Sequence, residues 1–445
     1  MRSFSALVGS HAHALTSQLS PPQLRLGPHR RGRGALTVSG VVTTPAYATV
    51  SANGKIPGMR PLPTSREDLQ GGLLGTMKSR FGSTPIIPCE LFLVTSWEEV
   101  SLELASDEPC PMEWLPGSGV SPSAISQGFA TSKGPVKQTM QDFFVAVSDA
   151  FGALMPLTPP AWRASQGPAI LHHSGAPFCL TAVFDGHGSG DHAARTAQES
   201  VLAAVASDTA LLDCFARNMD QLGVGPEVLP TLTAAFRRSF AELDAKICAE
   251  GEARGLPHDG TTALVSVQVG PKLYTANAGD CRAVLCRGGR AVRLSRDHKP
   301  ELPEERTRIE AAGGRVASVR GTWRVVLPLA DGCTAKVCSV SRGFGDRDFK
   351  AASLISAEPD VAAVVLAPHL DAFAIHASDG LWGAVNDQEA VDLVAEVIDK
   401  FTGMTSFNTQ HAAAAKAAAQ DLVKLARDRG SMDDVTVVVT LYDWD

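Results

Sequence analysis

The sequence contains no uninterrupted apolar run of the roughly 18 residues that a membrane-spanning helix requires. Its nine cysteines are scattered over 445 residues without a Cys-x-x-Cys pair, so neither a disulfide framework nor a zinc-binding cysteine cluster is indicated. The glycine-rich loop pattern of P-loop nucleotide-binding proteins and the HExxH pattern of zinc proteases are also missing. These absences favour a globular protein with reduced thiols.

Acidic residues are absent from positions 1–66, which carry eight Lys or Arg side chains. An acid-free, Arg-bearing start rich in Ser, Thr, Ala and Gly is typical of a transit peptide for a chloroplast or mitochondrion, and the apolar segment of a secretory signal is missing. The alternative is a disordered basic tail on a cytoplasmic or nuclear protein. The remaining chain holds 32 basic and 47 acidic side chains, and this acidic balance disfavours nucleic-acid binding because it repels phosphate.

Hydrophobic residues make up 44% of the chain, which is enough for a substantial core. We interpret residues 67–120 as a variable N-terminal extension and residues 121–445 as one domain, and we expect a monomer. Within this domain, short apolar segments of period two alternate with helical pairs such as 387–400 and 409–427. The pattern predicts an α+β fold with antiparallel β-sheets covered by helices. The strands near 263–286 read as one antiparallel meander.

Three aspartate-bearing turns lie at the ends of apolar strands that are far apart in the sequence. They contain Asp185, Asp379 and Asp433. Because strand interiors here are apolar, carboxylates at the strand ends are where Mg²⁺ or Mn²⁺ could find oxygen ligands. Two cations bridged by a carboxylate can activate a water molecule and clamp a phosphoryl group during in-line attack. The turns therefore predict a site for metal-dependent phosphoryl chemistry.

Asp185 is the best candidate for the bridging carboxylate because the adjacent Gly186 lets a backbone carbonyl approach a cation. His187 is placed to donate a proton to a leaving alkoxide. Taken singly, each has an ordinary explanation, since Asp-Gly usually forms a turn and an isolated histidine is more often structural. Their occurrence together with the other two acidic turns favours the catalytic interpretation.

The segment Cys281–Arg287 matches the Cys-x5-Arg spacing of cysteine-based phosphatases. That chemistry needs a thiolate at a helix N-terminus and a glycine-rich loop of backbone amides around the phosphate. These residues instead alternate as a strand, so we disfavour a cysteine nucleophile.

Eight blocks of sequence resemble the protein phosphatase 2C family of metal-dependent serine/threonine phosphatases, in the family's order. The blocks are Phe184–Gly188, Asp259–Ala263, Ala276–Leu285, Leu294–Pro300, Ser341–Asp346, Ala357–Pro359, Ala377–Trp382 and Gly430–Val437. The resemblance spans about residue 128 to the C-terminus. It implies two stacked antiparallel β-sheets flanked by antiparallel helix pairs, an α-β-β-α sandwich. It also implies hydrolysis of phosphoserine and phosphothreonine in phosphoprotein substrates with two Mn²⁺ or Mg²⁺ ions.

By this resemblance, Asp185 would bridge both metals, and the carbonyl of Gly186 would bind one of them. Asp379 and Asp433 would ligate the metals from their other sides, and Asp142 would contact a metal through a water molecule. These five positions match the family's metal ligands one by one.

The resemblance also makes His187 the general acid and Asp280 the ligand of a weaker third metal. The segments 296–300 and 315–334 correspond to a flap near the substrate groove. Where the family has a phosphate-binding arginine, the spacing from the early metal ligand points to Lys137, which keeps the charge but lacks the bidentate fork.

Three further positions depart from the family pattern. Gln141 replaces a glutamate, Gly383 replaces an aspartate of the third metal site, and Asp434 replaces an asparagine. The alternative to an active enzyme is a pseudophosphatase that keeps the fold as a binding or regulatory module; another metal-dependent hydrolase is a more distant possibility. Because the central acids are all present, we favour catalysis.

Overall fold

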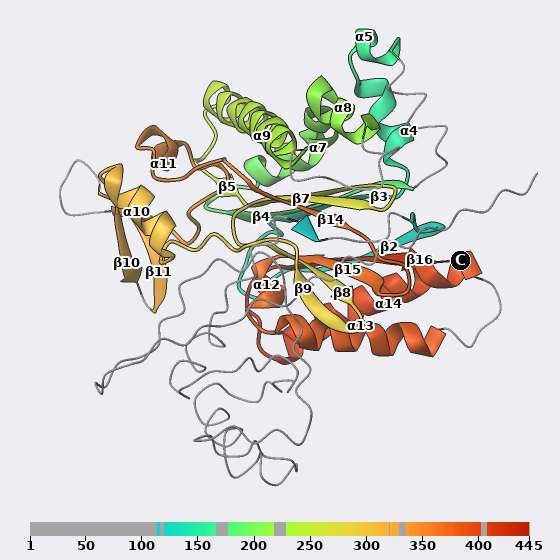
Figure 1. Cartoon of the computed structure of the whole chain (residues 1–445). Coiled ribbons are helices and arrows are strands. Elements are labelled where there is room, and N and C mark those ends of the chain that lie inside the picture. Colours follow the sequence, from blue (N-terminus) through green and yellow to red (C-terminus); the bar gives the residue numbers. More distant parts are fainter. Residues whose placement is uncertain are drawn as a thin grey trace, which may run out of the picture. The chain divides into compact units, whose positions relative to one another are not determined.

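The computed structural model describes residues 114–115, 120–165, 177–217, 228–319, 321–328, 335–401 and 407–444. The predicted transit peptide, residues 1–66, and nearly all of the predicted extension, residues 67–120, lie outside this part of the chain. Two stacked β-sheets with helices on their outer faces form the described domain (Figure 1). The predicted α-β-β-α sandwich is confirmed.

Within the described residues the first sheet contains eight strands. They are β1 (Trp114–Leu115), β3 (Asp142–Val147), β4 (Phe178–His187), β5 (Gly260–Thr261), β6 (Ala263–Val269), β7 (Lys272–Ala278), β13 (Phe344–Gly345) and β14 (Asp360–Val365). The second sheet runs in the order β2 (Ala124–Ser132), β16 (Val435–Asp443), β15 (Asp371–Ala377), β8 (Arg282–Arg287) and β9 (Arg290–Arg293). Neighbouring strands are antiparallel except for β1 and β14, which are parallel. Strand β1 consists of two residues of the predicted extension, so a short part of that extension joins the first sheet.

Helices cover the outer face of each sheet (Figure 1). Those over the first sheet are α4 (Ala150–Leu154), the short 3-10 helix η2 (Met155–Leu157), α5 (Pro160–Arg163), α7 (His192–Ser207), α8 (Thr209–Arg217) and α9 (Val228–Ala253). Those over the second sheet are α12 (Asp379–Trp382), α13 (Asp387–Phe401) and α14 (Phe407–Asp428). In the described part of the chain, no helix has both the length and the apolar character needed to cross a bilayer.

Strand alternation explains why the central strands are apolar on both faces. In β4, Ala182 and Phe184 pack in the cluster beneath the helices, whereas Val183 between them packs in the cluster between the two sheets. In β16, Val437 faces the helical side and Val438 faces the other sheet. Successive side chains of a strand point to opposite faces, so a strand buried on both sides reads as a continuous apolar run.

Close packing of α14 on β2 depends on small side chains. The buried face of α14 is rich in alanine, including Ala415, Ala418 and Ala419, and these residues pack on the second sheet. A Cβ on Gly128 of β2 would lie 2.1 Å from the backbone nitrogen of Lys416. Only glycine fits there, which fixes how closely the helix approaches the sheet.

The predicted meander at residues 263–286 is wrong at its third strand. Strands β6 and β7 form a hairpin in the first sheet, but β8 lies in the second sheet, between β9 and β15. The chain crosses between the sheets at Gly279, whose φ of +123° is readily adopted only by glycine. Sequence period alone could not distinguish this crossing from a hairpin turn.

A third, small sheet projects from one end of the sandwich (Figure 1). It contains β10 (Arg315–Val319), β11 (Thr322–Pro328) and β12 (Ala335–Cys338), and it lies between α10 (Pro303–Ala311) and α11 (Arg347–Ala351) in the chain. Its strands pair only with one another among the named strands, and its side chains share a separate apolar cluster with both helices. This small sheet contains the segment that the family resemblance assigned to a flap.

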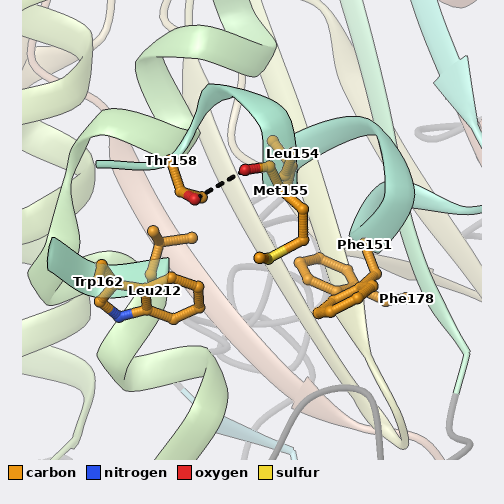
Figure 2. A pocket seen from close by; sticks show the side chains of 7 residues that line it. All are labelled: Phe151, Leu154, Met155, Thr158, Trp162, Phe178 and Leu212. Carbon is orange, nitrogen blue, oxygen red and sulfur yellow. Dashed lines mark hydrogen bonds between the residues drawn. The ribbon is translucent and has the colours of Figure 1, made fainter. Parts of the chain in front are cut away.

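A small apolar hollow lies beside α5 and α8. Figure 2 shows its lining, which is formed by Phe151, Leu154, Met155, Thr158, Trp162, Phe178 and Leu212. Phe178 begins β4 and Asp185 lies near its other end, so the strand separates the two by about 20 Å. The hollow is therefore remote from the acidic turns.

Candidate active site

Five aspartates from different strand ends gather at one edge of the sandwich, and we call them the acid cluster: Asp142, Asp185, Asp280, Asp379 and Asp433. Asp142 begins β3 and pairs in register with Asp185 on β4. Asp379 follows β15, and Asp433 precedes β16 by one residue. Since β15 and β16 are antiparallel neighbours, these two acids lie at the same sheet edge.

The acid cluster crowds negative charge around Asp185. Burial, followed by repulsion from the other four cluster carboxylates, raises the pKa of Asp185 well above its ordinary 3.8. Burial and the Asp434 carboxylate raise the pKa of Asp142 to about 6 despite its hydrogen bond with Ser378, and burial together with Asp280 raises the pKa of Asp379 to about 7. Both Asp142 and Asp379 lie within side-chain hydrogen-bonding reach of Asp185. Such crowding is costly unless positive charge is supplied.

The donors of the acid cluster suit a hard divalent cation. All are carboxylate oxygens, which Mg²⁺ and Mn²⁺ prefer. One oxygen of Asp142 accepts a hydrogen bond from the Ser378 hydroxyl at 2.7 Å, but the other is buried without a partner. A buried, unpaired carboxylate oxygen is expensive in free energy. A cation or its bound water would satisfy it.

Two lysines face the acid cluster. Lys137 Nζ lies 2.5 Å from Asp433 Oδ1 and 3.6 Å from Asp434 Oδ2. Burial lowers the pKa of Lys137, but these carboxylates together with Asp185 raise it more strongly. The predicted phosphate-binding residue thus lies beside a predicted metal ligand.

Lys299 forms an ion pair with Asp280, and its Nζ also lies 3.9 Å from Asp379. An ammonium group therefore faces the carboxylate predicted to hold a third metal. Gly383, where the family has a further acid, ends α12 and offers no carboxylate.

Asp434 and Gln141 fix the loop that carries Lys137. The Asp434 carboxylate, fully buried, accepts hydrogen bonds from the backbone nitrogens of Gly134 and Gln141, each at 2.7 Å. The Gln141 side-chain amide donates to the carbonyl oxygens of Gly188 and Gly190 at 3.3 and 2.8 Å. A glutamate could not donate these bonds. Both departures from the family pattern thus take part in positioning the loop.

Glycines next to the aspartates allow close backbone packing. A Cβ on Gly186 would lie 2.4 Å from the Gln141 carbonyl oxygen, and a Cβ on Gly380 would lie 1.8 Å from the Asp434 carbonyl oxygen. Any other residue would push β4 away from β3, or α12 away from the turn before β16. The Asp-Gly pairs therefore set the spacing of the acidic turns.

Arg427, which was not predicted from the sequence to belong to the site, holds the Asp433 turn in place through hydrogen bonds. From the end of α14 it donates to the carbonyl oxygens of Ser431 at 2.7 Å, Asp433 at 2.6 Å and Ser132 at 2.5 Å. The available signal was a basic residue in the last turn of a helix, directly before an acidic turn. Ser378, which binds Asp142, was likewise visible only as part of the Ser-Asp-Gly block.

His187 lies two residues beyond Asp185 on β4, on the same side of the strand. Its Nε2 lies 2.8 Å from Asp346 Oδ2 and 3.7 Å from Cys338 Sγ. Burial lowers the pKa of His187, but the Asp346 carboxylate and Cys338 raise it well above 6.5. The side chain remains 23% exposed. A protonated imidazole at this position can donate a proton to a bound molecule.

The Cys-x5-Arg segment does not form a phosphate site. Cys281 is fully buried before β8, and burial raises the pKa of its thiol well above 9. Arg287 ends the same strand and pairs with Asp371. Six residues of extended chain hold the two side chains roughly 20 Å apart.

Several known proteins are similar to this chain in sequence or in fold. The sequence model described as "Protein phosphatase 2C" matches residues 170–435. A rice protein (Oryza sativa subsp. japonica), "Probable protein phosphatase 2C 59", is 32% identical over 330 residues, covering 74% of this chain and 80% of its own. Another rice protein, "Probable protein phosphatase 2C member 13, mitochondrial", is 34% identical over 271 residues. The match covers 61% of this chain and 62% of that protein.

The solved structure of serine-threonine phosphatase 2C from Toxoplasma gondii aligns with a TM-score of 0.57 at 20% identity. The alignment covers 74% of this chain and 98% of the Toxoplasma protein, so the two proteins share the same fold. The chain belongs to the protein phosphatase 2C family of serine/threonine phosphatases.

Proposed function

We propose that this protein hydrolyses phosphoserine and phosphothreonine in proteins, using two Mn²⁺ or Mg²⁺ ions held by the acid cluster. The observation that carries the proposal is the crowding of four carboxylates around the buried Asp185, including an oxygen of Asp142 without a partner. When bound, the two cations supply an activated water and withdraw charge from the phosphoryl oxygens.

The roles of the metal-binding residues follow from their positions. Asp185 at the centre of the cluster would bridge both cations, and the Gly186 carbonyl would ligate one of them. Asp379 and Asp433 would complete the two coordination shells from the second sheet. Asp142, held by Ser378, would orient a metal-bound water through its unpaired oxygen.

Substrate phosphate would bind at Lys137, whose ammonium group would move from Asp433 toward the phosphoryl oxygens. The cations would then balance the charge of Asp433. His187, kept protonated by Asp346, would donate its proton to the departing serine or threonine oxygen. A third cation at Asp280 would have to displace Lys299. We therefore propose that two metals suffice for turnover.

The direct test is hydrolysis of a phosphothreonine peptide by the purified full-length chain. We expect turnover only with added Mn²⁺ or Mg²⁺. We expect Asp185→Asn to lower kcat by at least about a thousandfold, on the order of 4 kcal/mol of transition-state stabilisation. Asp428→Asn is the matched control, because that aspartate lies on the exposed face of α14 and pairs only with Lys424 among its contacts in the described structure. Turnover in EDTA, or full activity of Asp185→Asn, would refute the proposal.

A pseudophosphatase is the competing function, and the pairing of Lys299 with Asp280 is the observation that favours it. Such a module would bind a phosphopeptide without releasing phosphate. Equilibrium binding of the phosphopeptide, measured beside phosphate release with saturating Mn²⁺, separates the two functions.

We also propose that residues 1–66 direct the protein to a mitochondrion or chloroplast. Support comes from the acid-free, Arg-bearing composition of this segment and from a relative whose name includes "mitochondrial". A fluorescent fusion of residues 1–66 should enter an organelle, whereas the same segment with its arginines replaced by glutamate should not. Equal distribution of both fusions in the cytoplasm would contradict organellar targeting.

A further inference from the structure

Three side chains with different donor atoms meet beside the acid cluster: His187, Cys338 and Asp346. Their ligand atoms all lie within 4.8 Å of one another, which in the described part of the chain is true of no other group of three His, Cys, Asp or Glu side chains. The three come from β4, from the end of β12 in the small sheet, and from the residue before α11. Cys338 and Asp346 are each only 5% exposed, whereas His187 is 23% exposed and open on one side.

The backbone around this group is built to bring the donors together. Asp346 adopts the left-handed conformation, with φ of 51°, and its nitrogen is held by the Asp259 carbonyl oxygen at 2.9 Å. A Cβ on Gly260 would lie 2.2 Å from Asp346 Oδ2 and 2.5 Å from His187 Nε2. Glycine at this position therefore creates the space in which the carboxylate and the imidazole meet.

The separations are close to those of a tetrahedral zinc site. Bond lengths of about 2.3 Å to sulfur and about 2.0 Å to nitrogen or oxygen place neighbouring ligand atoms about 3.3–3.6 Å apart. The 3.7 Å between Cys338 Sγ and His187 Nε2 already fits. The 2.8 Å between His187 Nε2 and Asp346 Oδ2 would lengthen by roughly half an ångström as a cation replaces the shared proton. The exposed side of the histidine leaves a fourth position for water.

Donor chemistry separates this site from the acid cluster. A thiolate, an imidazole and a carboxylate together select a borderline-soft cation such as Zn²⁺, whereas an all-carboxylate cluster suits Mg²⁺ or Mn²⁺. We propose that His187, Cys338 and Asp346 form an inhibitory Zn²⁺ site distinct from the acid cluster. Binding releases two protons to solvent, the thiol proton of Cys338 and the proton that His187 Nε2 shares with Asp346, and it forms one bond each from zinc to sulfur, nitrogen and oxygen.

Inhibition rests on the function proposed above, because zinc on Nε2 would replace the proton that Asp346 holds on His187, the proposed proton donor. The zinc would also tie β12 to β4, and so connect the small sheet to the sandwich. Inhibition should therefore persist at saturating Mn²⁺, since the two cations occupy different donors.

The binding test uses Co²⁺ as a spectroscopic probe, titrated into the full-length protein already saturated with Mg²⁺. We expect one equivalent of Co²⁺ to give a near-ultraviolet thiolate-to-cobalt band that Zn²⁺ abolishes. Cys338→Ser, which keeps the size of the side chain, should lose this band. Cys214→Ala, which removes a buried thiol of α8 in the cluster beneath the helices, should keep it. A band of equal intensity in Cys338→Ser would overturn the site.

The inhibition test compares Zn²⁺ titrations of phosphopeptide hydrolysis at saturating Mn²⁺, with each variant normalised to its own zinc-free rate. We expect the half-inhibitory Zn²⁺ concentration to rise at least tenfold in Cys338→Ser and to stay unchanged in Cys214→Ala. An equal half-inhibitory concentration in both would overturn the inhibitory role. If the protein proved to lack phosphatase activity, the Co²⁺ band would still decide whether the site exists.

Discussion

Two groups of buried carboxylates in this protein differ in their affinity for protons. In the acid cluster, burial together with the neighbouring Asp434 carboxylate raises the pKa of the buried Asp142 to about 6. At the base of the small sheet, Glu305 is just as buried, yet its pKa falls to about 2. Burial opposes this fall, but hydrogen bonds from Arg342 and Arg308 outweigh it.

The difference lies in the partners that the chain supplies. Glu305 accepts hydrogen bonds from Arg342 at 2.6 and 2.9 Å and from Arg308 at 2.8 Å. Among the residues that the structure describes, the only basic side chains paired with the five acids of the acid cluster are Lys137 and Lys299. Carboxylates paired with arginine stabilise a fold, whereas carboxylates left in excess are a site that needs cations from solution.

The largest expected effect on stability comes from removing one of the two arginines that pair with Glu305. Arg342→Met should lower the free energy of unfolding by about 3 kcal/mol, because Glu305 would remain buried with one guanidinium instead of two. Urea denaturation at neutral pH measures the loss. Glu305→Gln combined with Arg342→Met should recover part of it, and an additive double mutant would argue against coupling between the two residues.

The pairing of Glu305 with its arginines should also make the free energy of unfolding depend on pH. Since the pKa of Glu305 falls from its ordinary 4.5 to about 2, its contribution to stability is complete above pH 4.5. That contribution is lost as the pH falls toward 2, and over the full range it amounts to about 3 kcal/mol. Wild type should therefore lose stability more steeply than Glu305→Gln between pH 4.5 and pH 3. Parallel curves from urea denaturation would show that this carboxylate is not the cause.

Neutralising an acid of the acid cluster should instead raise the stability of the protein when no cation is present. In EDTA, Asp379→Asn should raise the free energy of unfolding by about 1 kcal/mol, because it removes one of the repelling charges around Asp185. With Mn²⁺ present the variant should be the less stable protein, since a predicted ligand is gone. Thermal unfolding in both conditions tests this reversal, and destabilisation in EDTA would contradict it.

The smallest expected effect concerns Lys137. Lys137→Arg should lower KM for a phosphothreonine peptide by about two- to fivefold, since guanidinium binds phosphate through two parallel hydrogen bonds. Steady-state kinetics at saturating Mn²⁺ gives KM and kcat separately. An unchanged or raised KM would remove Lys137 from the phosphate site.

Much of the fold could be predicted from the sequence because local periodicity carries it. The helices expected at 387–400 and 409–427 correspond to α13 and α14, and the terminal apolar run corresponds to β16. The crossing of the chain between sheets at Gly279 could not be predicted, since a glycine turn looks the same whether it closes a hairpin or changes sheets. The candidate metal ligands remain predictions, although the structure brings them to one edge.

Contacts between distant charged or polar groups could not be predicted at all. Cys338 and His187 are 151 residues apart, and Asp346 contacts the histidine only because Gly260 leaves space. The pairing of Lys299 with Asp280 crosses from one loop to another. Sequence patterns report which residues share a strand or a helix face, but such contacts arise only when separate elements pack.

Strand β4, which carries Asp185, Gly186 and His187, is an interior strand. It is hydrogen-bonded to β3 on one side and to β6 on the other, and its apolar residues are buried on both faces. Amide protons of such a strand exchange with solvent only when the whole domain opens. Heat should therefore abolish catalysis at the temperature at which the domain melts, without an earlier local inactivation.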